Sequence, residues 1–217
     1  MRVLSLFDYT GNMLKPWQEA GYECHLVDIQ HPEGTSIRED GMVCHNLDLS
    51  IWFCHALTNP NHVLGGHYDF VACFPPCDSL AVSGARWFKG KGLRALEKSI
   101  AMFATAAEVA EASGAPYLIE NPVSTISTYW RKPDYTFHPW EYAGWCGDDH
   151  YKKKTCLWTG GGFVMPEKRP NPYTSKEPDN RIHTAPPGPE RKNFRSATPM
   201  GFARAVFEAN AKKRAAA

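Results

Sequence analysis

The sequence predicts an α/β protein with a mostly parallel β-sheet and helices on both faces of that sheet. The first observation is an alternation of short apolar runs with helical patterns from residue 1 to about residue 120. Strands that alternate with helices in this way build parallel sheets covered on both faces. The second observation is that 217 residues, of which 43% are hydrophobic, suffice for one core. We therefore expect a single domain over residues 1–217.

The expected elements follow from the spacing of apolar residues and from the glycines and prolines that interrupt it. Predicted strands are 2–7, 23–29, 42–47, 68–74, 117–119 and 155–159. Predicted helices are 13–20, 51–57, 93–113 and 198–213, the last with Thr198 as its cap. Residues 166–189 are rich in proline, lysine and asparagine, which predicts an extended loop.

The overall charge does not decide whether a nucleic acid is a partner, because 24 Lys and Arg residues balance 23 Asp and Glu residues. The basic clusters lie late in the chain, which is a modest indication of a basic face. The N-terminal residues run directly into a predicted strand without a signal-peptide pattern. No apolar run is long enough to span a bilayer, so we expect no membrane association.

The seven cysteines show no paired spacing, which is typical of reduced thiols in a cytosolic protein. A metal site would need a ligand spacing such as CxxC or HxxxH. The nearest candidates lack that spacing, so we expect no metal; they are Cys44, His45, Cys54, His55, His62 and His67.

The most informative segment is 74–80, with the sequence FPPCDSL, directly after a predicted strand. Parallel sheets bind ligands beyond the carboxyl ends of their strands. Pro75 and Pro76 restrict the backbone there and hold Cys77 at the mouth of the expected cleft. Its thiol could act as a nucleophile if a following helix N-terminus or a nearby cation lowers its pKa. A structural cysteine at a turn is an equally good interpretation of this segment alone.

A second segment, 118–122 with the sequence LIENP, also follows a predicted strand and ends in a proline. It places the carboxyl group of Glu120 at the same edge of the sheet, where a partly desolvated carboxyl group can donate a proton at neutral pH. One loop, one helix and one strand separate it from Cys77, so both side chains can lie beyond neighbouring strands. Taken alone, Glu120 is more often a loop acid.

Pro-Pro-Cys followed by Glu-Asn-Pro, on a sheet of this order, resembles the DNA cytosine-C5 methyltransferase family over nearly the whole chain. The resemblance implies a Rossmann-like S-adenosylmethionine-dependent methyltransferase fold. It implies that Cys77 adds to carbon 6 of an extruded cytosine while Glu120, beside Asn121, protonates ring nitrogen 3. Carbon 5 then takes the methyl group of S-adenosylmethionine. Loss of the carbon-5 proton and of the thiol restores the aromatic ring.

The cofactor residues match the family less completely. Residues 5–12 (SLFDYTGN) stand where the family has Asp-Leu-Phe-x-Gly-x-Gly-Gly, with Tyr9 at the first glycine position. By resemblance, Asp28 would take the ribose hydroxyls and Asp48 would contact adenine. The expected cofactor residues are Phe7, Gly11, Asp28, Ile29, Asp48, Leu49, Pro75 and Thr198.

The basic segment 151–157 (YKKKTCL) lies where the family has a Gln-x-Arg-x-Arg pattern. By position Lys154 would contact the cytosine carbonyl and Lys152 would match the preceding arginine, although lysine lacks the planar fork of arginine. Only 163–194, a short basic proline-rich loop, replaces the family's target-recognition domain. So short a loop could read one or two bases at most. It could hold phosphates through Lys168, Arg169, Lys176, Arg181, Arg191 and Lys192.

The resemblance therefore predicts a compact, phage-like methyltransferase acting on DNA in the cytoplasm of a bacterial or phage-infected cell, with short or relaxed sequence specificity. RNA or a free cytosine nucleotide is the alternative substrate, because the part that grips a duplex is nearly absent. A catalytically silent DNA- or cofactor-binding module is the alternative from another class. It would work with a separate recognition subunit or as a homodimer, but it would not need both Cys77 and Glu120.

Overall fold

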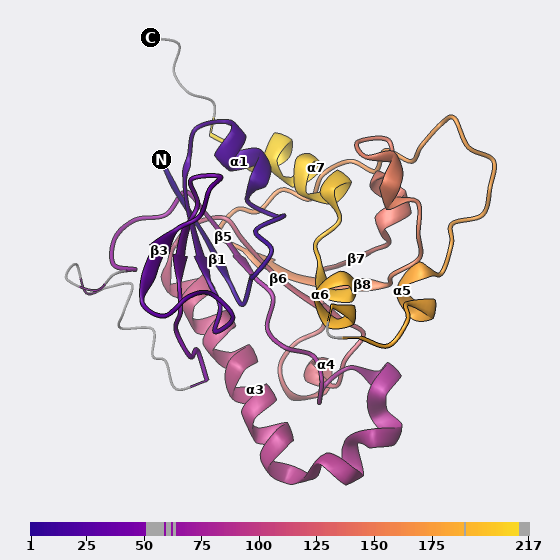
Figure 1. The fold of residues 1–217 in the computed structure, drawn as a ribbon, viewed down its shortest axis with the longest axis horizontal. Helices are drawn as coiled ribbons and strands as arrows, with labels where there is room; N and C mark the ends of the chain where they lie inside the picture. The colour runs from indigo at the N-terminus through magenta and orange to yellow at the C-terminus, as the bar shows by residue number, and fades with distance from the viewer. Residues whose placement is uncertain (51–58, 60–61, 63, 189, 213–217) are drawn as a thin grey trace.

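The computed structural model describes residues 1–50, 59, 62, 64–188 and 190–212, which form a mixed α/β structure around one eight-stranded sheet (Figure 1). The strand order is β3-β4-β2-β1-β5-β6-β8-β7. The α/β class with a mostly parallel sheet is thereby confirmed. The helix expected at 51–57 lies outside the described residues.

Five neighbouring strands run parallel and form the centre of the sheet. In spatial order they are β4 (Val43–His45), β2 (Glu23–Val27), β1 (Arg2–Leu6), β5 (Phe70–Cys73) and β6 (Tyr117–Pro122). After β1, the chain adds the parallel strands β2 and β4 on one side of β1. After β5, it adds β6 on the opposite side of the sheet. The strand order therefore reverses between β1 and β5, and a reversal of this kind opens a crevice at the carboxyl ends of the two strands.

Antiparallel strands complete both edges of the sheet. They are β3 (Thr35–Ile37), β7 (Tyr135–Phe137) and β8 (Thr155–Gly160). The sequence did not predict β3 or β7, which have three residues each and too few positions for an alternating pattern. β6 is longer than predicted, because Asn121 pairs with Cys156 and Pro122 with Thr155. β6 ends at Pro122, which has no N–H to donate to a neighbouring strand.

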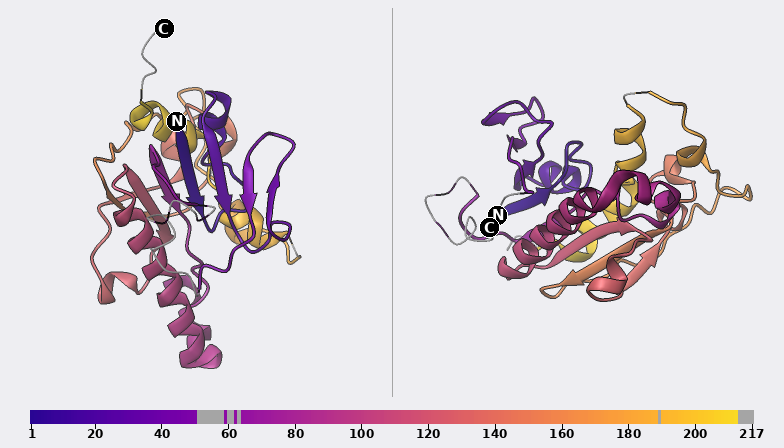
Figure 2. Two further views of the ribbon diagram at one scale, coloured as in Figure 1. Left: turned by 90° about the vertical axis from the view of Figure 1, so that its left-hand side faces the viewer. Right: turned by 90° about the horizontal axis from the view of Figure 1, so that it is seen from below.

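Helices cover both faces of the sheet (Figures 1 and 2). The long helix α3 (Phe88–Ala112) lies on one face, and α1 (Lys15–Glu19) and α7 (Met200–Asn210) lie together on the other. On the α3 face, Phe103 and Val109 pack with Leu4, Ile119 and Trp158. On the opposite face the core is formed by another set, which includes Val3, Trp17, Phe70, Leu118, Leu157, Phe202 and Val206. Burial of both helix layers fixes the strand ends in place.

The start of α3 differs from the prediction. The helix begins at Phe88 instead of residue 93 and is kinked at Gly92, whose φ of 77° is open to glycine because it has no Cβ. A 3₁₀ helix, η1 (Val82–Trp87), leads into it. Figure 1 shows η1 and the first turns of α3 projecting beyond the sheet.

The N-terminus of α7 also differs from the prediction. Thr198 does not cap the helix; Pro199 occupies the cap position without a side-chain hydrogen bond. Instead, the buried carboxylate of Asp149 accepts a hydrogen bond from the Gly201 backbone N–H. Gly201 is required because a Cβ there would lie 2.4 Å from the carbonyl oxygen of Tyr142. The C-terminal segment is thus tied to the segment before β8.

The remaining helices are short: α4 (Ile126–Tyr129), η2 (Pro139–Tyr142), η3 (Gly147–Asp149), α5 (Arg181–Thr184) and α6 (Arg191–Ser196). The extended loop predicted at 166–189 has little regular structure apart from α5. Among the helices of the described ranges, none combines the length and apolar character needed to cross a membrane. The six cysteines in those ranges are all free.

Candidate active site

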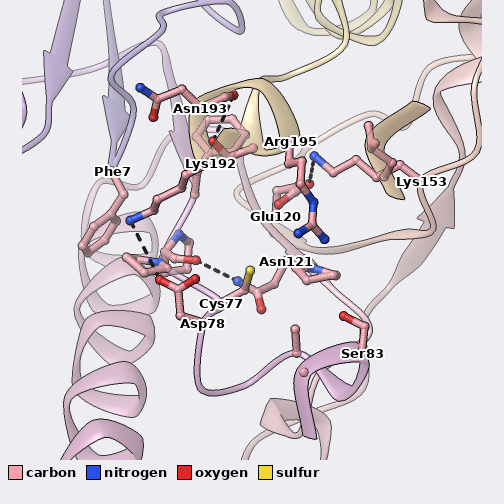
Figure 3. A pocket seen from close by; sticks show the side chains of 18 of the residues that line it. Phe7, Cys77, Asp78, Ser83, Glu120, Asn121, Lys153, Lys192, Asn193 and Arg195 are labelled. Carbon is pink, nitrogen blue, oxygen red and sulfur yellow. Dashed lines mark hydrogen bonds and ion pairs between the residues drawn. The ribbon is translucent and has the colours of Figure 1, made fainter. Parts of the chain in front are cut away.

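A cavity of about 870 Å³ lies at the carboxyl ends of the parallel strands (Figure 3). The segments after β1, β2, β5 and β6 all contribute to it, which places it at the strand-order reversal between β1 and β5. Helix α6 and the 3₁₀ helix η1 line its other sides. A cavity of this size can enclose a small organic molecule.

Cys77 lies in this cavity and is held by the backbone on both sides. Its carbonyl oxygen accepts hydrogen bonds from the N–H groups of Leu80 at 3.0 Å and Ala81 at 2.9 Å. On the other side, the buried Asn121 amide donates to the Pro75 carbonyl oxygen at 2.8 Å. The thiol-bearing loop after β5 is therefore anchored to the neighbouring strand β6, a role for Asn121 that its sequence position alone did not reveal.

The thiol of Cys77 is protonated in this environment. Burial, followed by the negative charges of Glu120 and Asp78, raises its pKa to about 11, while Lys153 acts in the opposite direction. Of the two causes that could have lowered this pKa, the nearby cation is present as Lys153, but the helix N-terminus is not, and the net effect is a raised pKa. A turn follows Cys77, and no helix begins before Val82.

Glu120 faces the same cavity from the end of β6, so the structure brings together the two residues on which the sequence analysis depended. The Lys153 ammonium lies 3.4 Å from a Glu120 carboxylate oxygen, and both side chains are at most 15% exposed. Figure 3 shows the two side chains pointing toward each other above Cys77. A thiol, a carboxylate and an ammonium group therefore share one partly dehydrated space.

Lys153, which the sequence analysis passed over, is the lysine that pairs with Glu120. Lys154 also lines the cavity, but Lys152 does not; its ammonium lies 3.3 Å from Glu177. In an antiparallel pair, opposite residues share a face, and Glu120 lies opposite Leu157. Lys153 lies an even number of residues before Leu157, so alternation along the chain places both side chains on the same face. The pairing of β6 with β8 therefore indicates that Lys153 lies on the Glu120 face.

Four of the expected cofactor residues line the cavity: Phe7, Asp28, Pro75 and Thr198. Phe7 has a φ of 56°, the only positive value for a non-glycine residue among those described. This turns the chain sharply at the end of β1. The Asp28 carboxylate accepts hydrogen bonds through one oxygen from the Gln30 backbone and side chain. Its other oxygen has no partner within the described ranges and is open to a ligand.

Gly11 shapes the loop after β1 without lining the cavity. Its φ is +73°, and a Cβ there would approach Arg38 and Leu26 to 2.9 Å. The loop is also held by Asp8, which the sequence analysis did not single out. Its buried carboxylate accepts hydrogen bonds from the Gly11 N–H at 2.8 Å and from the Ser5 hydroxyl at 2.8 Å. These hydrogen bonds fix the loop after β1.

The other expected cofactor residues lie outside the cavity. Leu49 is buried in the core on the α3 face of the sheet. The Asp48 carboxylate is exposed and accepts a hydrogen bond from the Ser50 N–H at 2.9 Å. Ile29 is 64% exposed beside Asp28 but does not line the cavity.

Of the basic residues expected to hold phosphates, Arg191 and Lys192 line the cavity from α6, together with Arg195. The Lys192 ammonium lies 3.8 Å from the Asp78 carboxylate, across the cavity from α6 (Figure 3). The others lie elsewhere: Lys168 pairs with Glu141, Arg181 pairs with Asp179, Arg169 lies over the Trp145 ring, and Lys176 is exposed.

Within the described ranges, no three His, Cys, Asp or Glu side chains are grouped closely enough to hold a metal ion. Cys54 and His55, two of the candidates considered above, lie outside those ranges. A comparison with known protein families finds no match for this chain. A search of curated proteins finds none either.

Proposed function

We propose that this protein transfers a methyl group from S-adenosylmethionine to carbon 5 of cytosine in DNA. The observation that carries the proposal is that Cys77 and Glu120 line one cavity beyond neighbouring parallel strands, with Lys153 beside Glu120. Methylation at carbon 5 of cytosine needs a soft nucleophile at carbon 6 and an acid at ring nitrogen 3. A thiol and a carboxyl group in one space meet that requirement.

The protons of this reaction can be exchanged between groups in the cavity. With a pKa near 11, Cys77 carries its proton in the free protein, so this proton must leave as the sulfur attacks. Glu120 lines the same cavity, with the Lys153 ammonium 3.4 Å from its carboxyl group. Attack of the sulfur on carbon 6 releases the thiol proton, and nitrogen 3 takes up one proton through Glu120. The carbon–sulfur bond that forms therefore needs no external acid or base. After methylation, the carbon-5 proton leaves to solvent as the carbon–sulfur bond breaks. Nitrogen 3 then returns its proton through Glu120 to the sulfur, which restores the Cys77 thiol.

The residues at the other end of the cavity fit S-adenosylmethionine. Asp28 offers a free carboxylate oxygen to the ribose hydroxyls, and Phe7 and Thr198 line the cavity nearby. When bound, the cofactor supplies an electrophilic methyl group. The parallel strands follow the order third, second, first, fourth and fifth along the chain, as in Rossmann-like sheets that bind nucleotides at this edge.

The experiment is transfer of a labelled methyl group to single-stranded DNA, duplex DNA, RNA and a free cytosine nucleotide. We expect transfer to DNA by the wild-type protein, loss of transfer in Cys77→Ser, and normal transfer in Cys146→Ser. Cys146 is a matched control because it is also half-buried but does not line the cavity.

Two outcomes contradict the proposal. Transfer only to RNA or to the mononucleotide would change the substrate. Absence of transfer to all four, with S-adenosylmethionine bound, would indicate a catalytically silent module.

A further inference from the structure

Two unlike surfaces border the cavity at its open side. One is an apolar lip formed by Val82, Trp87 and Val123, from η1 and the loop after β6. The other is a basic wall formed by Arg191, Lys192 and Arg195 of α6. Four acidic residues also line the cavity, three on loops that follow strands and Glu120 in β6. They are Asp8, Asp28, Asp78 and Glu120.

The lip exposes a large apolar area that the fold does not use. Trp87 is 59% exposed, Val82 47% and Val123 38%. The Val82 N–H donates to the Val123 carbonyl at 3.0 Å, so these two residues form one continuous edge. The Arg86 guanidinium lies 5.0 Å from the centre of the Trp87 ring. An exposed indole beside a cation is a platform on which an unpaired base can stack.

The wall presents cations that lack strong partners. Arg195 makes no ion pair or side-chain hydrogen bond with any described residue, and Figure 3 shows its guanidinium directed toward Cys77 and Asn121. Arg191 Nε is shielded from solvent without an acceptor in the described part of the chain. Lys192 has only its 3.8 Å contact with the exposed Asp78. A row of anions would satisfy all three side chains.

We propose that this cleft binds single-stranded DNA, with phosphates against the wall, bases against the lip, and the target cytosine over Cys77. The inference rests on the proposed function, whose substrate it narrows. A positive surface opposite an aromatic one is the arrangement that binds single strands without reading their sequence. A basic surface alone would bind the phosphates of a duplex equally well. The apolar lip is therefore the feature that favours a single strand over a duplex.

A duplex fits the same surfaces less well. A base in a duplex is already stacked on both sides, so it cannot stack on the Trp87 ring. Extruding a cytosine from a duplex also costs a few kcal/mol, which a single strand does not require. Within the described part of 163–194, regular structure is limited to α5 and the start of α6, neither of which is long enough to follow a groove.

The test is fluorescence anisotropy with labelled oligonucleotides of about 12 nucleotides, a length near the site size of single-strand binding folds. Without cofactor, we expect single-stranded DNA to bind at least about tenfold more tightly than the matched duplex. Trp87→Ala should weaken that binding about tenfold, whereas Trp87→Phe should largely restore it because a ring remains. The exposed Tyr173→Ala is the matched aromatic control.

The wall is tested by the salt dependence of binding. Lys192→Ala with Arg195→Ala should weaken binding and flatten the plot of log affinity against log salt by about 0.7 for each lost phosphate contact. Lys176→Ala is the matched control, because it removes an exposed charge outside the cavity. It should change neither the affinity nor the slope of the salt dependence.

Duplex binding as tight as single-strand binding, or no effect of Trp87→Ala, would overturn the inference. Tighter binding of single-stranded RNA would overturn its assignment to DNA. Because binding is measured without methyl transfer, the two proposals can fail separately. Single-strand binding through Trp87 without transfer would contradict only the proposed function, and transfer with a preference for duplex would contradict only this inference.

Discussion

The two sides of the cavity differ in how their functional side chains are held. On the strand-end side, Cys77 follows the buried strand β5 and Glu120 lies near the end of β6, and Asn121 ties their two segments together with a buried hydrogen bond. On the α6 side, Lys192 and Arg195 are exposed on a six-residue helix. The long Lys192–Asp78 contact connects the two sides. Asp78 is also held from α3, because the Lys91 ammonium donates to its carbonyl oxygen.

Under the two proposals above, the strand-end side carries the chemistry and the α6 side selects the substrate. The reacting groups need fixed distances, and the sheet provides them because its core is closely packed on both faces. A strand of variable sequence needs cations and a stacking surface that can adjust, and exposed side chains on short elements provide these. We therefore expect changes on the strand-end side to have large effects and changes on the α6 side to have small effects on stability.

The largest effect is expected for Glu120→Gln. Loss of the acid should reduce methyl transfer by about 10²- to 10⁴-fold, the usual contribution of a positioned acid or base. The same change removes a negative charge that raises the Cys77 pKa, so alkylation of Cys77 by iodoacetamide should become faster. Peptide mass mapping measures that alkylation. Alkylation no faster than in the wild type would contradict this role of the Glu120 charge. Because unfolding would also expose the thiol and speed alkylation, an unchanged midpoint of denaturant unfolding is the control.

The raised pKa of Cys77 predicts a steep pH dependence. Its thiolate fraction should increase about tenfold per pH unit between pH 7 and pH 10, because the pKa lies near 11. The measurement is the alkylation rate of Cys77 in the free protein at a series of pH values. A rate that levels off below pH 9 would contradict the burial and the two negative charges that we describe.

Asn121→Ala should destabilise the protein by about 2 kcal/mol, because it leaves the buried Pro75 carbonyl without its donor. Asn193→Ala on α6 is the matched control, since no hydrogen bond of its side chain is found in the described part of the chain, and it should change stability by less than about 0.5 kcal/mol. Denaturant unfolding measures both. An equal loss of unfolding free energy in the two variants would contradict the difference in stability that we expect between the strand-end side and the α6 side.

Asp78→Asn tests the connection between the sides. It removes a negative charge that raises the Cys77 pKa, so alkylation at pH 8 should become several-fold faster, by less than in Glu120→Gln because Glu120 is the larger cause. Asp148→Asn, an exposed acid outside the cavity, should leave the rate unchanged. An Asp78→Asn rate equal to wild type would show that this carboxylate does not act on the thiol.

The smallest effect on stability is expected for Lys192→Ala. Its contact with Asp78 is 3.8 Å long and both side chains are more than 60% exposed (67% and 64%). Such exposed pairs contribute about 0–1 kcal/mol. A loss above about 2 kcal/mol in denaturant unfolding would mean that α6 supports the fold, contrary to the comparison above.

The strand-end side could be predicted from the sequence because its signals are local. Pro75-Pro76-Cys77 and Glu120-Asn121-Pro122 each follow an apolar strand, and a parallel sheet brings the ends of such strands to one edge. The structure places both segments in the same cavity. The helix ends were less predictable, since Asp149 binds the α7 terminus from outside the helix.

The rest of the site depends on pairings between distant segments. Lys153 faces Glu120 only because β8 runs antiparallel to β6, a pairing that no local pattern indicates. The lip and the wall come from η1 and α6, which are short helices with no apolar periodicity of their own. The raised Cys77 pKa likewise arises from burial and from charges that reach the cavity from other strands.

The central claim is that Cys77 forms a covalent bond with carbon 6 of cytosine. The most direct measurement is mass spectrometry of the protein incubated with S-adenosylmethionine and single-stranded DNA containing 5-fluorocytosine. Fluorine cannot leave carbon 5 as a proton does, so the bond should persist. We predict an adduct on the Cys77 peptide in the wild type and in Cys146→Ser, and none in Cys77→Ser. No adduct while the cofactor is bound, or an adduct that survives Cys77→Ser, would contradict the claim.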